Sequence, residues 1–308
     1  MRFAQQMQRA TWAVMTLSVA ALGFPASADA QQQGRKIYIS ADMEGVVGAV
    51  TGDQLGPGGF EYQRFREFMT REVLAAINAA REEGATEFVV SDSHGNGENL
   101  LLEMLPEDIT VVRSWPRPLG MMQGIDDTFD GAIFLGYHAG TTNPQGVRAH
   151  TMSSATLADI RLNDRSALEA GVNAAIAGHF GVPVIMISGD DATIAEARAF
   201  IGDFEGAVVK WNYGFHSART VMPEAAYRLI GESVRAAMRR LDEFEPLRLG
   251  TPVALDVRFK NYRPAEVIAY LPIVERTSSH TIRFVGNDML EVSRFLQFLG
   301  HYEAGLTP

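Results

Sequence analysis

Residues 36–45 read Lys-Ile-Tyr-Ile-Ser-Ala-Asp-Met-Glu-Gly, a short apolar run that ends at two carboxylates, Asp42 and Glu44. The same order returns at 88–95, where Phe-Val-Val-Ser-Asp-Ser-His-Gly places His94 directly after an apolar run. Apolar runs of this length, bounded by glycine and small polar residues, are typical of buried strands in a parallel sheet. Both segments therefore predict a strand that ends at a polar, metal-binding type of side chain.

A third run of the same kind, Ala-Ile-Phe-Leu-Gly-Tyr-His-Ala at 132–139, ends at His138. The carboxyl ends of parallel strands form the crevice where ligands bind in open α/β sheets. We therefore expect the three strand ends to bring two carboxylates and two imidazoles together. Two carboxylates this close repel each other unless a cation lies between them. The chain has no cysteine, so the ligands available are histidine and carboxylate, a mixture that suits zinc or a similar divalent metal.

Strand-like and helix-like segments alternate from residue 35, which indicates an α/β fold with a mostly parallel sheet. After residue 215 the order changes to one strand, a helix, two strands and a helix, which is typical of a smaller two-layer α+β unit. We therefore predict an α/β metal-binding catalytic domain over 31–215 and a smaller α+β domain over 216–308. The main expected helices lie at 61–83, 193–201, 223–244, 264–271 and 288–301. One more is expected to begin after a cap at Ser166.

Residues 1–30 are typical of a signal peptide. Arg2 and Arg9 give a positive start, an apolar run follows at 12–24, and a small-x-small cleavage site lies at 28–30. The alternative is an uncleaved N-terminal anchor, although the apolar run is short for a membrane span. We expect cleavage, a periplasmic or secreted mature protein, and no membrane partner thereafter.

The charge of the chain argues against nucleic acids and anionic membranes as partners. Its formal net charge is −10. Nucleic acids and anionic membranes bind basic surfaces, so neither is expected as a partner.

Three further acidic or histidine positions could carry chemistry. His150 follows a polar loop at 140–149 and is well placed for proton transfer or nucleophilic attack. Glu169 lies on an apolar helical face, where an unpaired carboxylate is costly, so a metal or a cationic partner is expected. The pair at 190–191, two aspartates after a strand, competes for a ligand role. Taken singly, each of these residues could also be a solvated loop acid or a hydrogen-bonded loop histidine.

In combination these motifs resemble the zinc D-aminopeptidase family, typified by the dipeptide-operon enzyme. The likeness covers nearly all of the chain after the signal peptide. It rests on Ser40–Gly45, Asp92–His94, Gly124–Ala139, His150, Asn163–Arg165, Glu169, Gly189–Asp191, Lys260–Tyr262 and Asn287–Glu291.

The resemblance implies a metal-dependent aminopeptidase that cleaves small peptides with an N-terminal D-residue, D-Ala preferred. It also implies a ring-like homo-oligomer, such as a decamer. Two zinc ions per subunit are implied, with Asp42 shared between them and His150 as the catalytic nucleophile. The implied ligands are Asp42, Glu44, His94, His138 and Glu169.

Two other functions fit the same residues. A binuclear site of this kind also serves hydrolases of ester or phosphoester bonds. Exported two-domain α/β proteins also include periplasmic binding proteins, which would capture a peptide or metal without turnover. Hydrolysis of D-Ala-D-Ala with added zinc separates the peptidase from the binding protein.

Overall fold

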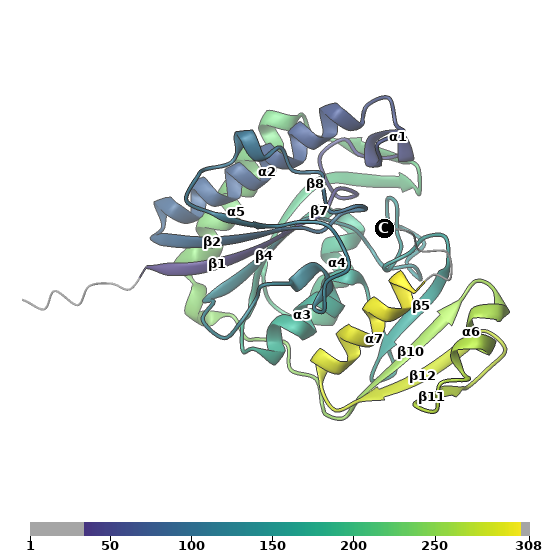
Figure 1. The fold of residues 1–308 in the computed structure, drawn as a ribbon. Coiled ribbons are helices and arrows are strands. Elements are labelled where there is room, and N and C mark those ends of the chain that lie inside the picture. The colour runs from purple at the N-terminus through teal and green to yellow at the C-terminus, as the bar shows by residue number, and fades with distance from the viewer. Residues whose placement is uncertain (1–33, 303–308) are drawn as a thin grey trace, which may run out of the picture. The chain divides into compact units, whose positions relative to one another are not determined.

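The computed structural model describes residues 34–302, so the expected signal peptide lies outside the described residues. The predicted mostly parallel sheet is present, with seven strands in the order β3-β2-β1-β4-β7-β8-β9. All its neighbouring strands are parallel except the last pair, β8 and β9 (Figure 1). The strands are β1 (Arg35–Ala41), β2 (Ala85–Asp92), β3 (Thr110–Val112), β4 (Gly131–Tyr137), β7 (Val184–Asp190), β8 (Glu205–Gly214) and β9 (Ser217–Thr220).

Helices cover both faces of this sheet (Figure 1), which explains why its central strands are apolar along their whole length. α2 (Tyr62–Glu82) and α5 (Pro223–Arg239) pack on one face. α3 (Glu169–His179) and α4 (Asp191–Ile201) pack on the other. The shorter helices are α1 (Gly52–Leu55), η1 (Leu102–Met104), η2 (Gly120–Met122) and η3 (Leu241–Glu243).

A second sheet of five antiparallel strands has the order β11-β12-β10-β5-β6. Its core is continuous with the α3 face of the first sheet. Its strands and helices are β5 (Leu157–Leu162), β6 (Arg165–Ser166), β10 (Val253–Phe259), α6 (Tyr262–Ile268), β11 (Val274–Arg276), β12 (Thr281–Gly286) and α7 (Met289–His301).

The two sheets do not divide the chain at residue 215. β5 and β6 precede this position, yet they pair with β10 in the second sheet. The β8–β9 hairpin and α5 extend beyond it, yet they belong to the first sheet and its helical layer. The described residues form one compact unit. Hydrophobic patterning identifies strands but not the partners with which they pair, so this arrangement could not be read from the sequence.

Two local expectations differ from the structure. Ser166 lies in β6, and α3 begins at Glu169 without a side-chain cap at Leu168. The β8–β9 hairpin lies where the sequence predicted only a domain boundary. None of the helices in residues 34–302 is long and apolar enough to cross a membrane.

Candidate metal centre

The three predicted strand ends lie side by side, because β1 pairs with both β2 and β4. Ile39 is opposite Val90 on one side and Ile133 on the other. Asp42 and Glu44 follow β1, while one histidine follows each neighbouring strand. The three strands therefore end at the same level, at one edge of the sheet, as predicted.

Asp42 lies between two imidazoles. Its Oδ1 is 3.1 Å from His94 Nδ1, and its Oδ2 is 3.3 Å from His138 Nε2. The same His94 nitrogen is 2.8 Å from Glu44 Oε2. All four side chains are buried. Each carboxylate oxygen of Asp42 thus faces a different imidazole.

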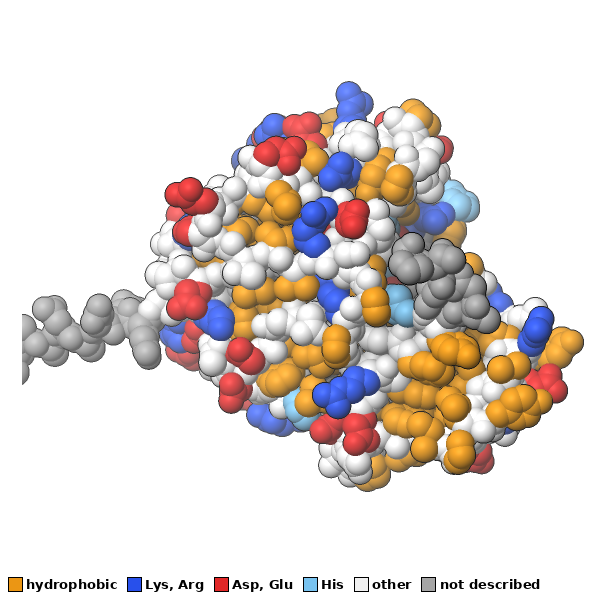
Figure 2. All heavy atoms as spheres, viewed as in Figure 1, with side chains coloured by type: hydrophobic (Ala, Val, Ile, Leu, Met, Phe, Trp, Pro, Cys, Tyr) orange, Lys and Arg blue, Asp and Glu red, His pale blue; other side chains and the backbone are white. Residues whose placement is uncertain are grey.

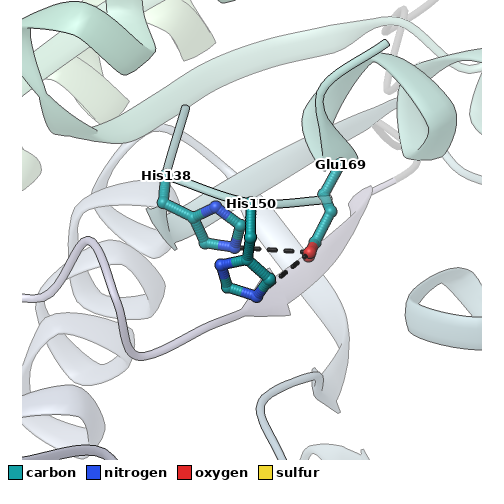
Figure 3. Close-up of side chains that lie close together, drawn as sticks. All are labelled: His138, His150 and Glu169. Atoms are coloured by element: carbon teal, nitrogen blue, oxygen red, sulfur yellow. Dashed lines mark ion pairs between the residues drawn. The ribbon is translucent and has the colours of Figure 1, made fainter. Parts of the chain in front are cut away.

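The other half of the cluster is shown in Figure 3, where His138, His150 and Glu169 converge. Glu169 comes from the first turn of α3, and its Oε1 is 3.4 Å from His138 Nε2 and 3.6 Å from His150 Nε2. The same oxygen accepts a hydrogen bond from the backbone N–H of Met152 at 2.7 Å. The two histidine rings stack with centroids 4.0 Å apart and planes 8° apart. The structure therefore brings together all six residues singled out in the sequence.

Close backbone contact between β1 and β4 sets this geometry. Asp42 N donates to Leu135 O at 2.8 Å, and Gly45 N donates to Gly136 O at 2.6 Å. A Cβ on Gly45 would lie 2.0 Å from Tyr137 O, and Gly136 has a φ of 68°. Glycine is required at both positions, because a side chain would separate the two strand ends.

Each histidine uses one ring nitrogen to bind a backbone carbonyl. His94 Nε2 is 2.6 Å from Leu55 O, and His138 Nδ1 is 3.1 Å from Ala139 O. His150 Nδ1 is 2.8 Å from a carbonyl oxygen of its own loop. A carbonyl oxygen only accepts, so the ring nitrogen that faces it carries the proton. The other nitrogen of each neutral ring then presents its lone pair to the cluster, which is how metal-binding histidines are oriented.

Burial and close charges shift the pKa values of the group. Burial, together with the charge of Glu44, raises the pKa of Asp42. Burial also opposes ionisation of Glu44, but the neighbouring imidazoles outweigh it and hold the pKa of Glu44 well below its usual range. The pKa values of His94 and His138 lie well above the ordinary value, because nearby carboxylates overcome the effect of burial. Without a metal, the surrounding negative charge therefore favours the protonated form of both imidazoles.

The residues present fit a divalent metal. Asp42 Oδ2, Glu44 Oε2 and His138 Nε2 are buried, and although each lies close to another atom of the cluster, these contacts lack hydrogen-bond geometry, so the three atoms have no hydrogen-bond partner among the described residues. Such atoms are costly unless something binds them. Two groups, Asp42/Glu44/His138 and His138/His150/Glu169, each bring their possible ligand atoms within 4.8 Å of one another. Carboxylate oxygens and imidazole nitrogens in this mixture match the ligands of zinc.

The competing aspartates do not join this cluster. Asp190 caps α4 by accepting from Thr193 N at 2.7 Å, and its other oxygen accepts from Val147 N at 2.6 Å. Asp191 accepts from Asn212 N at 3.1 Å. The sequence showed that these two aspartates follow a strand. It did not show that backbone N–H groups donate hydrogen bonds to their carboxylate oxygens.

Asp92 lies two residues before His94, but it makes no hydrogen bond to the His94 ring. Its carboxylate instead accepts from the backbone amides of Asn99 and Leu100 and from Asn99 Nδ2. Asn99 Nδ2 in turn donates to the carbonyl of His94 at 2.6 Å. Asp92 therefore shapes the loop that carries His94, while Leu55 holds the ring.

Sequence reasoning missed two buried charges beneath the centre. Lys210, on β8, donates to the carbonyls of Glu44, Val46 and Ala49, and burial lowers its pKa to about 8. Glu72, on α2, accepts from a backbone N–H of the same loop, and burial raises its pKa to about 7. The only sequence signal was a charged residue within an otherwise apolar strand or helix pattern. Such a pattern does not show which side chains the packing buries.

The cluster opens into a cavity of about 1150 Å³. The walls come from both sheets, with the metal-binding side chains at one end and residues of α6 and α7 at the other. A cavity of this size holds a small organic molecule or a short peptide.

An α/β fold with a buried histidine–carboxylate centre at the strand ends, open to such a cavity, defines a metal-dependent hydrolase. The family described as D-aminopeptidase, peptidase M55, matches residues 35–298. The chain therefore belongs to the D-aminopeptidase family, and it is a metal-dependent peptidase of that family.

Two relatives agree with this assignment. A D-aminopeptidase of Bacillus subtilis (strain 168) is 37% identical over 257 residues, which are 83% of this chain and 93% of that protein. A solved structure described as the Zn-dependent D-aminopeptidase DppA from Bacillus subtilis, a self-compartmentalizing protease, superimposes with a TM-score of 0.82 and 34% identity. The superposition covers 88% of this chain and all of the solved one. These findings confirm the predicted enzyme class and favour it over the ester or phosphoester hydrolase and the binding protein.

Proposed function

We propose that this D-aminopeptidase uses two zinc ions per subunit to remove an N-terminal D-residue, D-Ala preferred, from small peptides. The observation that carries this proposal is the position of Asp42, whose two oxygens face different imidazoles at 3.1 and 3.3 Å. A carboxylate in this position suits a bridge between two metals. The solved relative is described as Zn-dependent, which supports zinc as the metal.

The ligands fall on two sides of Asp42. Glu44 and His94 would complete one metal site, and His138 and Glu169 the other. Metals held by these residues would supply polarisation of the scissile carbonyl and a more acidic bound water.

His150 is assigned the catalytic role. Its Nδ1–H is held by a backbone carbonyl, so the lone pair on Nε2 faces the cavity near Glu169. Stacking on the His138 ring restricts the tilt of the imidazole. A nitrogen held in this way is positioned either to attack the carbonyl or to accept a proton from the attacking group.

Location and assembly complete the proposal. The signal-peptide pattern of residues 1–30 supports a mature enzyme in the periplasm or outside the cell, where peptidoglycan releases peptides containing D-alanine. The solved relative is described as self-compartmentalizing, which supports a homo-oligomer, in our proposal a ring, for this chain.

Side-by-side kinetics of the zinc-loaded enzyme test the substrate. The peptides are D-Ala-D-Ala, L-Ala-L-Ala and N-acetyl-D-Ala-D-Ala. We expect kcat/KM for the D-peptide to exceed that for its L-epimer by about 10²-fold or more, because a site that fixes the amine and carbonyl rejects the wrong hand at Cα by steric clash. Equal rates for both epimers, or efficient cleavage of the acetylated peptide, would overturn the proposal.

A further inference from the structure

The active-site cavity is lined by buried residues around the metal centre, here called its metal end, and by more exposed residues of α6 and α7, here called its open end. Asp42 and His138 are only 2% and 1% exposed, whereas Val267 and Phe298, which line the opposite end, are 48% and 36% exposed. An aminopeptidase substrate has no residue before its amine. The N-terminal residue therefore fits the metal end, and the part that leaves after cleavage extends toward α6 and α7.

The open end is mainly apolar. Figure 2 shows hydrophobic side chains gathered on the face formed by the second sheet and α7. A wall of this kind binds an apolar ligand most tightly, because each CH₂ group that is buried stabilises the complex by about 0.8 kcal/mol. The apolar residues that line this end come from β10, α6, the segment just after α6, and α7, and they include Phe259, Val267, Ile268, Leu271, Leu296 and Phe298.

One cation lies in this apolar region. Within residues 34–302, Arg263 is the only lysine or arginine that lines the cavity. Its guanidinium makes no hydrogen bond or ion pair with the described residues. The carboxylates of the cavity lining, by contrast, are confined to Asp42, Glu44 and Glu169 at the metal end. A short peptide has the matching polarity, with its amine at one end and its carboxylate at the other.

The size of the cavity points in the same direction. Its volume of about 1150 Å³ is slightly larger than the range typical of pockets for a drug-sized molecule, roughly 300–1,000 Å³. A dipeptide of two alanines would leave most of the apolar wall without a partner. A larger apolar residue on the leaving side would cover it.

We propose that the open end is a binding site for the leaving part of the substrate, and that Arg263 binds its free carboxylate. The substrate class is then a short peptide with a free C-terminus and a bulky apolar residue after the N-terminal D-residue. This inference rests on the proposed D-aminopeptidase activity. It makes Val267 and Arg263 specificity-determining residues.

Kinetics on three peptides test the inference in the zinc-loaded full chain: D-Ala-D-Ala, D-Ala-D-Leu and the C-terminal amide of D-Ala-D-Leu. In the wild type we expect kcat/KM for D-Ala-D-Leu to exceed that for D-Ala-D-Ala by about tenfold or more. The amide should have a KM about tenfold higher than the free acid, because it lacks the charge that Arg263 binds.

Two substitutions separate the parts of the site. Arg263→Gln should raise the KM for D-Ala-D-Leu by about tenfold and leave the amide unchanged, whereas Arg258→Gln, on neighbouring β10 but outside this cavity, should change neither. Val267→Asn should reduce the preference for D-Leu over D-Ala. The matched change Val285→Asn, at a similarly exposed valine outside the cavity, should not.

The outcomes distinguish this inference from the proposed function. Hydrolysis of all three peptides with equal kcat/KM would overturn the inference and leave the D-aminopeptidase activity in place. The same holds if Arg263→Gln and Arg258→Gln behave alike. No hydrolysis of any of the three peptides would overturn the proposed function, and the inference with it.

Discussion

At the scale of single residues, the candidate ligands at the strand ends could be located from the sequence because each comes after a recognisable apolar run. Asp42, Glu44, His94 and His138 were identified by the strands before them, and the structure places them together. The partners that orient them could not be predicted. The carbonyl of Leu55, which holds the His94 ring, belongs to a short helix with no metal-binding motif, and its position depends on tertiary packing alone.

Replacing Asp42 with alanine should release metal from both halves of the centre. Each of its oxygens faces a different imidazole, so one substitution removes a donor from both sides. Metal analysis of the purified variant measures the effect, with Asp191→Ala as the control, because Asp191 lies outside the cluster. Two equivalents of metal retained in Asp42→Ala would contradict the bridging role.

His150→Ala tests whether this residue is catalytic or a ligand. We expect the variant to keep its metal and to lose kcat by about 10³-fold or more, as enzymes do when a nucleophile or base is removed. His179→Ala, at the exposed end of α3, should behave as the wild type. Loss of metal in His150→Ala would instead make it a ligand together with His138 and Glu169, a grouping that the geometry permits.

At the scale of helices and strands, patterning located most elements but not their neighbours. The periodicity over 61–83 predicted α2 to within a residue at each end. β5 was predicted as a strand, but nothing in its sequence indicates that it pairs with β10 rather than with the first sheet. Strand pairing depends on contacts between distant segments, which local propensity does not encode.

Glu72 gives α2 a measurable dependence of stability on pH. Burial raises the pKa of Glu72 to about 7 in the folded protein. Between the ordinary pKa of a glutamate and about 7, the folded protein therefore keeps a proton on Glu72 that the unfolded protein has released. This stabilisation is complete below the unfolded pKa and is lost as the pH rises through about 7.

Glu72→Gln should therefore flatten this dependence and stabilise the protein at pH 8 by up to about 3 kcal/mol, since one pKa unit corresponds to about 1.4 kcal/mol. Glutamine keeps an acceptor for Val47 N, which Glu72 binds at 2.9 Å. Urea unfolding of zinc-loaded protein at pH 5 and pH 8 measures the difference, and Glu67→Gln, on the exposed side of the same helix, is the control. Identical pH profiles for Glu72→Gln and the wild type would contradict the argument.

At the scale of the whole molecule, the fold class and the ligand cluster could be predicted, but the cavity could not. Its metal end lies on the first sheet, while Phe259 and the helices of the second sheet form its far wall. Leu157 of β5 also lines the cavity, and β5 is held there by its pairing with β10, which the sequence left open. The sequence therefore did not reveal the substrate-binding cavity, although it indicated the metal chemistry.

The metal centre joins four distant segments of the chain, so metal removal should destabilise the whole molecule. Asp42 and Glu44, His94, His138, and Glu169 come from separate elements, and in the unfolded chain they form no site. Zinc at about 100 times its Kd stabilises the folded state by about 2.7 kcal/mol, so chelation should lower Tm by about 5–10 °C in a protein of this size. Asp42→Asn, which lacks the charge of the central carboxylate, should show no zinc-dependent shift. Thermal unfolding with chelator, and again after zinc is restored, measures both effects. An unchanged Tm in wild-type protein shown to be free of metal would mean that the metal does not hold these segments together.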